Sequence, residues 1–180
     1  SQDVVIVSAL RTVIGKYKGM WAKIEAHNLG KSVIQNILSQ SKVNQSSIDE
    51  VIMGQVLTGG TGQNPARQAA KGAGIPDEKT AYNINQVCGS GLRAIILGYQ
   101  SILLNDSKII IAGGQENMSF SNQEYMLQDG LIDAFNNYHM GVTAENVAEK
   151  CNISRKEQDN FALSSQTKTQ EAIKNKKFKD

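Results

Sequence analysis

The chain has 180 residues and a formal net charge of +2, with 40% hydrophobic and 20% charged residues. This composition is typical of a globular protein and excludes an intrinsically disordered chain. Because the 19 basic and 17 acidic residues are scattered along the sequence, nothing favours binding to nucleic acid.

No apolar run approaches the roughly 20 residues that cross a bilayer, so we expect no membrane anchor. The sequence opens directly on an apolar run without the features of a secretory signal, so we expect no secretion. Two cysteines, Cys88 and Cys151, are too few for a disulfide framework and fit a reducing compartment. These features predict a cytoplasmic protein.

Short apolar runs alternate with segments whose apolar residues recur at helical spacing. Strands are predicted at residues 3–9, 50–57, 80–85 and 108–112. Helices are predicted to follow them, with caps or first turns at Asn28, Pro65 and Gly89. Each of these strands, including the one at residues 3–9, must then be covered on both of its faces. The alternation therefore predicts an α/β fold, in which a mostly parallel sheet carries helices on both faces.

The alternation stops after the fourth predicted strand, where the chain becomes polar and then helical. We therefore predict an α/β domain over residues 1–118 and the beginning of a helical loop domain over residues 119–180. A short helix is predicted over 143–149, and a capping box at residues 154–157 predicts a longer one that ends near Lys177. The buried stripe of this long helix is predicted at Phe161, Ala162 and Ser165.

A cysteine stands where the third predicted strand gives way to a helix, in the segment Asn85–Arg93. A thiol at a helix N-terminus faces unsatisfied backbone N–H groups and the positive end of the helix dipole, and both favour the nucleophilic thiolate. Gly89 and Gly91 allow a sharp turn and close approach of a substrate. Cys88 is thus a candidate nucleophile for attack on an acyl carbonyl, with backbone N–H groups to stabilise the oxyanion. A buried structural cysteine is the alternative.

The same residues also satisfy a dinucleotide-binding pattern, because Gly89–Ala94 reads G-x-G-x-x-A between a strand and a helix. Such a site needs an acidic residue about 20 positions later, at the end of the next strand. Here Glu116 comes only after a glycine pair, and the pattern falls at the third strand and not the first. The dinucleotide reading is therefore the weaker one.

Five segments, in the same order along nearly the whole chain, resemble thiolases. They are residues 8–12, 62–68, 85–94, 113–119 and 138–146. The Tyr138–Gly141 segment is similar to the biosynthetic branch of that family, which forms acetoacetyl-CoA. The resemblance implies a thiolase-like layered fold with the beginning of its substrate-binding loop domain.

The resemblance implies a reversible acyl transfer that condenses two molecules of acetyl-CoA into acetoacetyl-CoA and coenzyme A. Cys88 matches the nucleophile that carries the acetyl group as a thioester. Leu131, His139 and Met140 match residues that line the coenzyme A and acyl pocket, with Met140 restricting it to short chains. His139 alone would suggest a general base, but the family places it at the substrate. A thiolase for longer 3-ketoacyl chains is a less favoured alternative.

The partners implied are acetyl-CoA and acetoacetyl-CoA and a second copy of the chain in a homodimer, with a tetramer as the further possibility. Coenzyme A thioesters enter as substrate, and neither a separate cofactor nor a metal is implied. The connection between Met118 and Asp129 is shorter than the family's, whose longer excursion joins dimers into tetramers.

The resemblance covers only the first half of a thiolase. The family's activating histidine and second catalytic cysteine lie in a C-terminal α/β domain that these residues do not contain. We therefore expect the 180 residues alone to be inactive as an enzyme. The alternative is a catalytically silent half that dimerises or needs a separate C-terminal partner. A native subunit mass of about 40 kDa would favour a longer enzyme over that alternative.

Four other residues that could suggest chemistry receive structural interpretations. His27 is expected at the surface or at a helix cap, and Cys151 as a half-buried structural thiol. Glu116 is expected to accept hydrogen bonds from nearby backbone donors and to shape the wall around Cys88. Arg67 is expected to be a structural or interface arginine.

Overall fold

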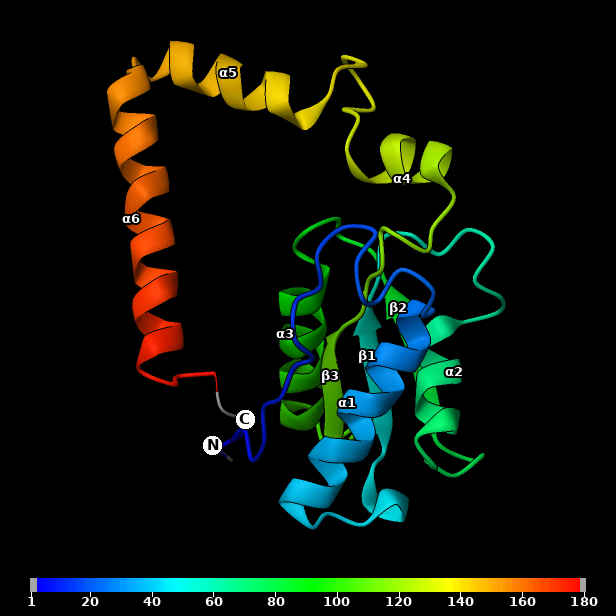
Figure 1. Ribbon diagram of the computed structural model, residues 1–180. Coiled ribbons are helices and arrows are strands. Elements are labelled where there is room, and N and C mark those ends of the chain that lie inside the picture. Colours follow the sequence, from blue (N-terminus) through cyan, green and yellow to red (C-terminus); the bar gives the residue numbers. More distant parts are fainter. Residues whose placement is uncertain (1–2, 179–180) are drawn as a thin grey trace. The chain divides into compact units, whose positions relative to one another are not determined.

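The computed structural model describes residues 3–178 (Figure 1). The chain divides into two compact units, Ser1–Gly130 and Leu131–Asp180. The helix α4 (Gln123–Gly130), which was not predicted, belongs to the first of them. The predicted domain boundary after residue 118 concerns the domains of the complete protein and stays a prediction.

The first unit is an α/β structure built on a three-stranded parallel sheet of strand order β2-β1-β3. This confirms the predicted fold class. Its strands are β1 (Glu50–Gly54), β2 (Thr80–Ile84) and β3 (Ile110–Gly114). Its other helices are α1 (Ala26–Ser41), the 3-10 turn η1 (Gln45–Ser47), α2 (Pro65–Gly72) and α3 (Ser90–Leu103).

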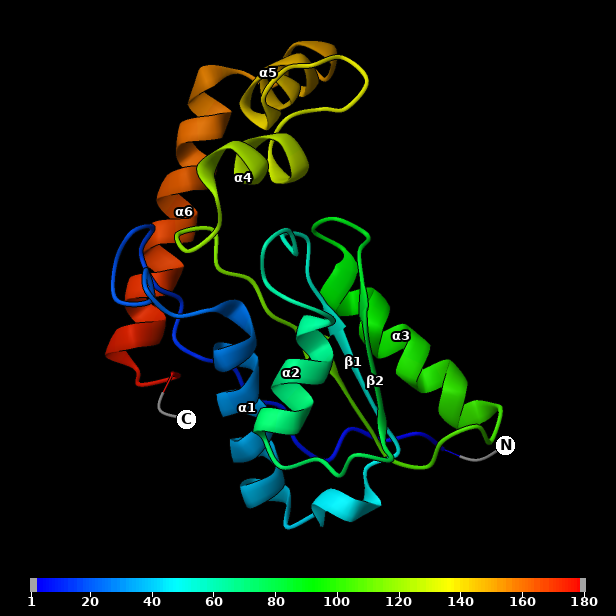
Figure 2. The same ribbon diagram turned by 90° about the vertical axis from the view of Figure 1, so that its right-hand side faces the viewer.

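Helices cover both faces of the sheet, with α1 and α2 on one face and α3 on the other (Figures 1 and 2). Side chains of a strand alternate between the faces. Val51 and Met53 of β1 therefore join the core formed with α1 and α2, and Ile52 between them points to the side of α3. Right-handed crossovers place α2 and α3 on opposite faces, because the chain moves outward from β1 to β2 and then back past β1 to β3.

The side of α3 that faces away from the sheet is apolar and exposed. Leu92, Ile95, Tyr99 and Leu103 have exposed fractions of 67%, 42%, 50% and 41%. They follow one another at helical spacing, whereas Ala94 and Gly98 face the sheet and are buried. We call these four side chains the outer stripe of α3.

The predicted strand at residues 3–9 does not form. This segment pairs with none of the strands in the described part of the chain, and Val5, Ile6 and Val7 are 71%, 78% and 70% exposed. β-branched residues suit a strand, but a strand exists only where a neighbouring strand satisfies its backbone groups. Of the four predicted strands, three form within the described residues, and the one predicted at residues 3–9 does not.

The start of α1 also differs from the prediction. The helix begins at Ala26 after Glu25, so Asn28 is not its cap but lies in its first turn. The Asn28 side chain donates to the Glu25 carboxylate at 3.3 Å. His27 is half-buried in the same turn, with its Nε2 3.5 Å from the Glu25 carboxylate, and is neither a surface nor a capping residue. Asn28 was predicted as the cap because asparagine is a common capping residue and the polar loop before it does not mark where the helix begins.

At the N-terminal ends of the strands, Asp49 connects β1 to the segment that enters β3. Its Oδ2 accepts hydrogen bonds from the backbone N–H groups of Lys108 at 2.7 Å and Ile109 at 3.1 Å. The N–H of Lys108, and then that of Ile109, hold the pKa of Asp49 below its usual value, and the Lys79 ammonium, 3.7 Å away, acts in the same direction. The carboxylate therefore fixes the register at which the two strands begin.

We expect Asp49→Asn to lower the stability of the protein at neutral pH, by about 1 kcal/mol, because hydrogen bonds to a charged acceptor are the stronger ones. A depressed carboxyl pKa contributes stability that is present above the unfolded value of about 3.9 and is lost as the pH falls through the folded value. The thermal unfolding midpoints of wild type and variant should therefore differ at pH 7 and converge once the pH has fallen below the lowered pKa of Asp49. A difference that persists unchanged in acid would contradict this account of Asp49.

The second unit contains α5 (Met140–Lys150) and α6 (Arg155–Lys174). The predicted capping box is confirmed, since the Ser154 hydroxyl and the Glu157 side chain each bond the other residue's backbone. The predicted buried stripe is wrong, because Phe161 is 79% exposed and Ala162 and Ser165 are exposed as well. An apolar stripe is buried only against a covering element, and none packs there within the described residues. Across residues 3–178, no helix has the length and apolar character needed to span a membrane.

Candidate active site

Cys88 lies in the five-residue connection between β2 and α3, directly before Gly89, which caps the helix. The residue is exposed and its thiol is free. Val87, just before it, has φ +49°. A β-branched residue in the left-handed region is a genuine outlier and costs about 1–3 kcal/mol. The chain therefore turns sharply at the candidate nucleophile, as the strand-to-helix pattern predicted.

Hydrogen bonds between neighbouring residues hold this turn. The Ser90 hydroxyl accepts from the Gln86 N–H at 2.8 Å and donates to the Val87 carbonyl at 2.6 Å. The Val87 N–H donates to Asn85 Oδ1 at 2.9 Å, and the Gly89 N–H to the Gln86 carbonyl at 3.0 Å. The turn is thus bonded on both sides of Cys88.

The first turn of α3 rests directly on the C-terminal ends of two strands. A methyl group on Gly54, the last residue of β1, would lie 2.6 Å from the Ser90 carbonyl carbon and 2.8 Å from the Gly91 nitrogen. A methyl group on Gly114, the last residue of β3, would lie 3.3 Å from the Gly54 oxygen. Side chains are absent at both strand ends, so the helix that follows Cys88 packs against bare backbone.

The segment after β3 is bonded to the segment after β1. Gln115 Nε2 donates to Gln55 Oε1 at 2.9 Å, and both glutamines are buried. The Glu116 carboxylate accepts from the N–H groups of Val56 at 2.8 Å and Leu57 at 3.2 Å. Desolvation raises the pKa of Glu116, although part of the residue is exposed to solvent. The N–H groups of Val56 and Leu57 lower the pKa and so oppose this rise. The prediction that Glu116 serves backbone donors is confirmed, and its place in the wall around Cys88 stays a prediction.

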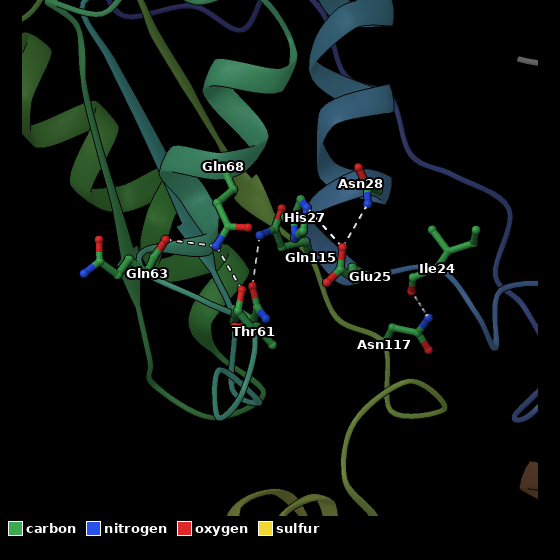
Figure 3. Close-up of polar contacts among 10 residues, drawn as sticks. Ile24, Glu25, His27, Asn28, Thr61, Gln63, Gln68, Gln115 and Asn117 are labelled. Carbon is green, nitrogen blue, oxygen red and sulfur yellow. Dashed lines mark hydrogen bonds and ion pairs between the residues drawn. The ribbon is translucent and has the colours of Figure 1, made fainter.

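The glycine-rich loop between β1 and α2 is fixed by a side chain of α2. Gln68 Nε2 donates to the carbonyl oxygens of Thr61 and Gln63, both at 2.9 Å (Figure 3). Asn64 caps α2 by accepting from the Arg67 N–H at 3.0 Å. The Arg67 guanidinium donates to the backbone carbonyls of Asp77 and Lys79, which confirms a structural role for this arginine.

The three candidate pocket residues lie together in the second unit, around the start of α5. The Met140 N–H donates to the Leu131 carbonyl at 2.9 Å, and Ile132 pairs with His139 in an isolated antiparallel bridge. Leu131 is half-buried, and His139 and Met140 are exposed. Cys88 belongs to the other unit. The structure thus brings Leu131, which precedes a loop, next to His139 and Met140, which follow it.

His139 has a structural task that the sequence analysis missed. Its Nδ1 accepts from the Gly141 N–H at 3.0 Å, and it is the N-cap of α5. The signal was available in part, because the residue precedes a helix, but histidine is uncommon as a cap compared with serine, threonine, aspartate or asparagine. This bond uses the unprotonated Nδ1 and fixes the orientation of the ring.

The second cysteine and the possibility of a metal site also bear on the chemistry of the described residues. Cys151 is exposed at the C-terminal cap of α5, so the expectation of a half-buried thiol was wrong. Within the described residues, no group of three or more histidine, cysteine, aspartate or glutamate side chains could hold a metal ion.

Comparison with known proteins places this geometry in a family. Residues 4–180 match the family described as "Thiolase, N-terminal domain". The chain is 49% identical to an acetyl-CoA acetyltransferase of Rhizobium meliloti over 194 residues, which cover 99% of this chain and 49% of that protein. It is 50% identical to one of Pseudomonas aeruginosa over 196 residues (99% and 50%) and 47% identical to the cytosolic acetyl-CoA acetyltransferase of Rattus norvegicus over 190 residues (97% and 48%).

The chain spans about half the length of the curated relatives it matches. The alignments run over more positions than the chain's own 180 residues, so these relatives carry residues within the matched region that this chain lacks. Because the family match extends over residues 4–180, the chain belongs to the thiolase family and represents its N-terminal domain.

Proposed function

We propose that the whole protein is an acetyl-CoA C-acetyltransferase, which condenses two molecules of acetyl-CoA into acetoacetyl-CoA and coenzyme A and also catalyses the reverse thiolysis. The observation that carries the proposal is the exposed Cys88 in a bonded turn at the start of α3. Relatives of 47–50% identity that are named acetyl-CoA acetyltransferase support this choice of reaction over other acyl transfers.

In the first half-reaction, the Cys88 thiolate attacks the carbonyl carbon of acetyl-CoA. A bond forms between Sγ and the acetyl carbon, the bond from that carbon to the sulfur of coenzyme A breaks, and the departing thiolate takes up a proton. The exchange of one thioester for another is nearly neutral in free energy, so the acetyl group stays reactive on the enzyme. We propose that backbone N–H groups of this turn that are not bonded within it stabilise the oxyanion of the tetrahedral intermediate.

In the second half-reaction, the methyl group of another acetyl-CoA loses a proton, and its carbon attacks the acetyl group on Cys88. A carbon–carbon bond forms, the bond to Sγ breaks, and acetoacetyl-CoA leaves. We propose that the groups that move protons in both half-reactions come from the rest of the protein, since the matched relatives are about twice as long as this chain. Coenzyme A serves as part of the substrate, and the proposed reaction needs neither a separate cofactor nor a metal.

We further propose that Leu131, His139 and Met140 line the site for coenzyme A and the acyl group. Their support is their common turn at the start of α5 and the bond that fixes the His139 ring. A homodimer in the cytoplasm, with a tetramer as the further possibility, completes the proposal. The free, exposed state of both Cys88 and Cys151 is compatible with a reducing compartment.

The test uses the protein expressed from its full reading frame, incubated with acetyl-CoA labelled in the acetyl group and quenched in acid before digestion. We expect one acetyl group per subunit, on the peptide that contains Cys88, with release of an equal amount of coenzyme A. Label on any other residue, or no label, would contradict the proposed function. Unlabelled acetyl-CoA added after the pulse should move the label into acetoacetyl-CoA.

A further inference from the structure

Val87 adopts a backbone conformation that valine disfavours, and it does so next to the reactive sulfur. Its φ of +49° lies in the region that glycine and asparagine occupy readily and β-branched residues avoid. Its side chain is 52% exposed, so burial of the side chain does not compensate for this conformation. Some other interaction must hold the turn, because an unrestrained valine would return to an extended or helical conformation and rotate the peptide that joins it to Cys88.

The Ser90 side chain supplies such an interaction, in addition to the bond from the Val87 N–H to Asn85 Oδ1. Its hydroxyl receives the Gln86 N–H at 2.8 Å and donates to the Val87 carbonyl at 2.6 Å, so it binds the backbone on both sides of the Val87 α-carbon. An oxygen with both its donor and an acceptor position engaged has one orientation. The backbone groups before and after Val87 are thereby kept at the spacing that the left-handed conformation requires.

Ser90 is itself held by a different element. It is only 4% exposed, and its Cβ lies within 2.6 Å of the position that a methyl group on Gly54 of β1 would occupy. The sheet therefore fixes the α-carbon and Cβ of Ser90, and Ser90 in turn fixes the turn. A serine that merely satisfied its own hydrogen-bonding groups at a helix start would not need this close contact with a strand.

We infer that Ser90 is a positioning residue for acetyl transfer: its hydroxyl supports the left-handed conformation of Val87 and so orients the Cys88 sulfur toward the substrate carbonyl. The inference rests on the proposed function, because it assumes that Cys88 is the acetylated residue. Ser90 acts through the backbone and touches no substrate. Its loss therefore lowers the rate of acetylation and leaves the affinity for acetyl-CoA unchanged.

The test measures acetylation of Cys88 in a single turnover, as the burst of coenzyme A released from acetyl-CoA, with the protein expressed from its full reading frame. Ser90→Ala should slow the burst about 10- to 100-fold, since small misplacement of a reacting group has effects of that size. The acetyl-CoA concentration that gives half the maximal burst rate should stay unchanged. Ser101→Ala is the matched control, because Ser101 lies further along α3 and its buried hydroxyl has no hydrogen-bond partner among residues 3–178.

The decisive comparison repeats Ser90→Ala in a Val87→Gly background. Glycine adopts the left-handed conformation without assistance, so the same Ser90→Ala change should there slow the burst less than about threefold. An equal loss in both backgrounds would overturn the inference, since the hydroxyl would then act by packing or by another route. A burst of wild-type rate in Ser90→Ala would overturn it as well.

The two proposals fail in different ways. Wild-type protein without acetyl on Cys88 would overturn the proposed function, and with it this inference. Wild-type protein that acetylates Cys88 while Ser90→Ala acetylates it equally fast would overturn only the role of Ser90. Circular dichroism of each variant establishes that its overall helix content matches the wild type, so that loss of rate in an unfolded variant is not counted.

Discussion

Replacement of Cys88 by alanine is expected to remove acetyl transfer almost entirely, with a loss of at least about a thousandfold in turnover, because the covalent intermediate cannot form. The thermal unfolding midpoint should stay within a degree or so, since Cys88 is exposed among the described residues and exposed substitutions change stability little. Steady-state formation of acetoacetyl-CoA and differential scanning calorimetry measure the two quantities on the same preparation.

Cys151→Ala is the matched control for this substitution, because the residue is the other free and exposed thiol and caps the end of α5. It should keep its activity and also its sensitivity to thiol-alkylating reagents. Activity in Cys88→Ala within tenfold of wild type would exclude Cys88 as the carrier of the acetyl group. Loss of activity in Cys151→Ala would indicate that the second thiol takes part after all.

Gly54→Ala should destabilise the protein by about 3 kcal/mol, or force α3 away from the sheet, because the new methyl group would lie 2.6 Å from the Ser90 carbonyl carbon and 2.8 Å from the Gly91 nitrogen. Both atoms belong to backbone, so no side-chain rotation relieves the contact. If α3 moves, the turn that holds Cys88 moves with it. We therefore expect slower acetylation of Cys88 in addition to a lower unfolding midpoint.

Gly113→Ala provides the comparison, since Gly113 lies in β3 beside β1 and a methyl group there would meet nothing within 4 Å. It should change stability by less than about 1 kcal/mol and leave acetylation intact. A Gly54→Ala protein that unfolds and acetylates as Gly113→Ala does would show that the strand end and the helix start have room to separate.

The sheet could be predicted from the sequence because its signals are local. The runs beginning at residues 50 and 108 show the apolar, β-branched pattern of a buried strand, and the run beginning at residue 80 mixes apolar and polar residues. The strands β1, β2 and β3 lie there with ends shifted by a few residues. The turn at Cys88 was predicted for the same reason, since a strand, a cysteine and two glycines follow one another within a short segment. The capping box of α6 is likewise encoded in four consecutive residues.

Features that depend on distant partners could not be predicted in this way. The run at residues 3–9 has the pattern of a strand but pairs with none in the described residues, and Phe161 has the spacing of a buried residue but stays exposed. A pattern records which face would be buried if something covered it, and not whether something does. The role of Ser90 in holding the turn was equally hidden, because it depends on the contact between this residue of α3 and Gly54 at the end of β1.

The outer stripe of α3 has a practical consequence for laboratory work on the unit Ser1–Gly130. Four exposed apolar side chains along one helix, from Leu92 to Leu103, make a surface of the kind that promotes aggregation. Exchanging Leu92 and Tyr99 for lysine or glutamate would render that strip hydrophilic without touching the sheet-facing Ala94 and Gly98. Such a pair of changes would make this piece of the molecule easier to concentrate for spectroscopy.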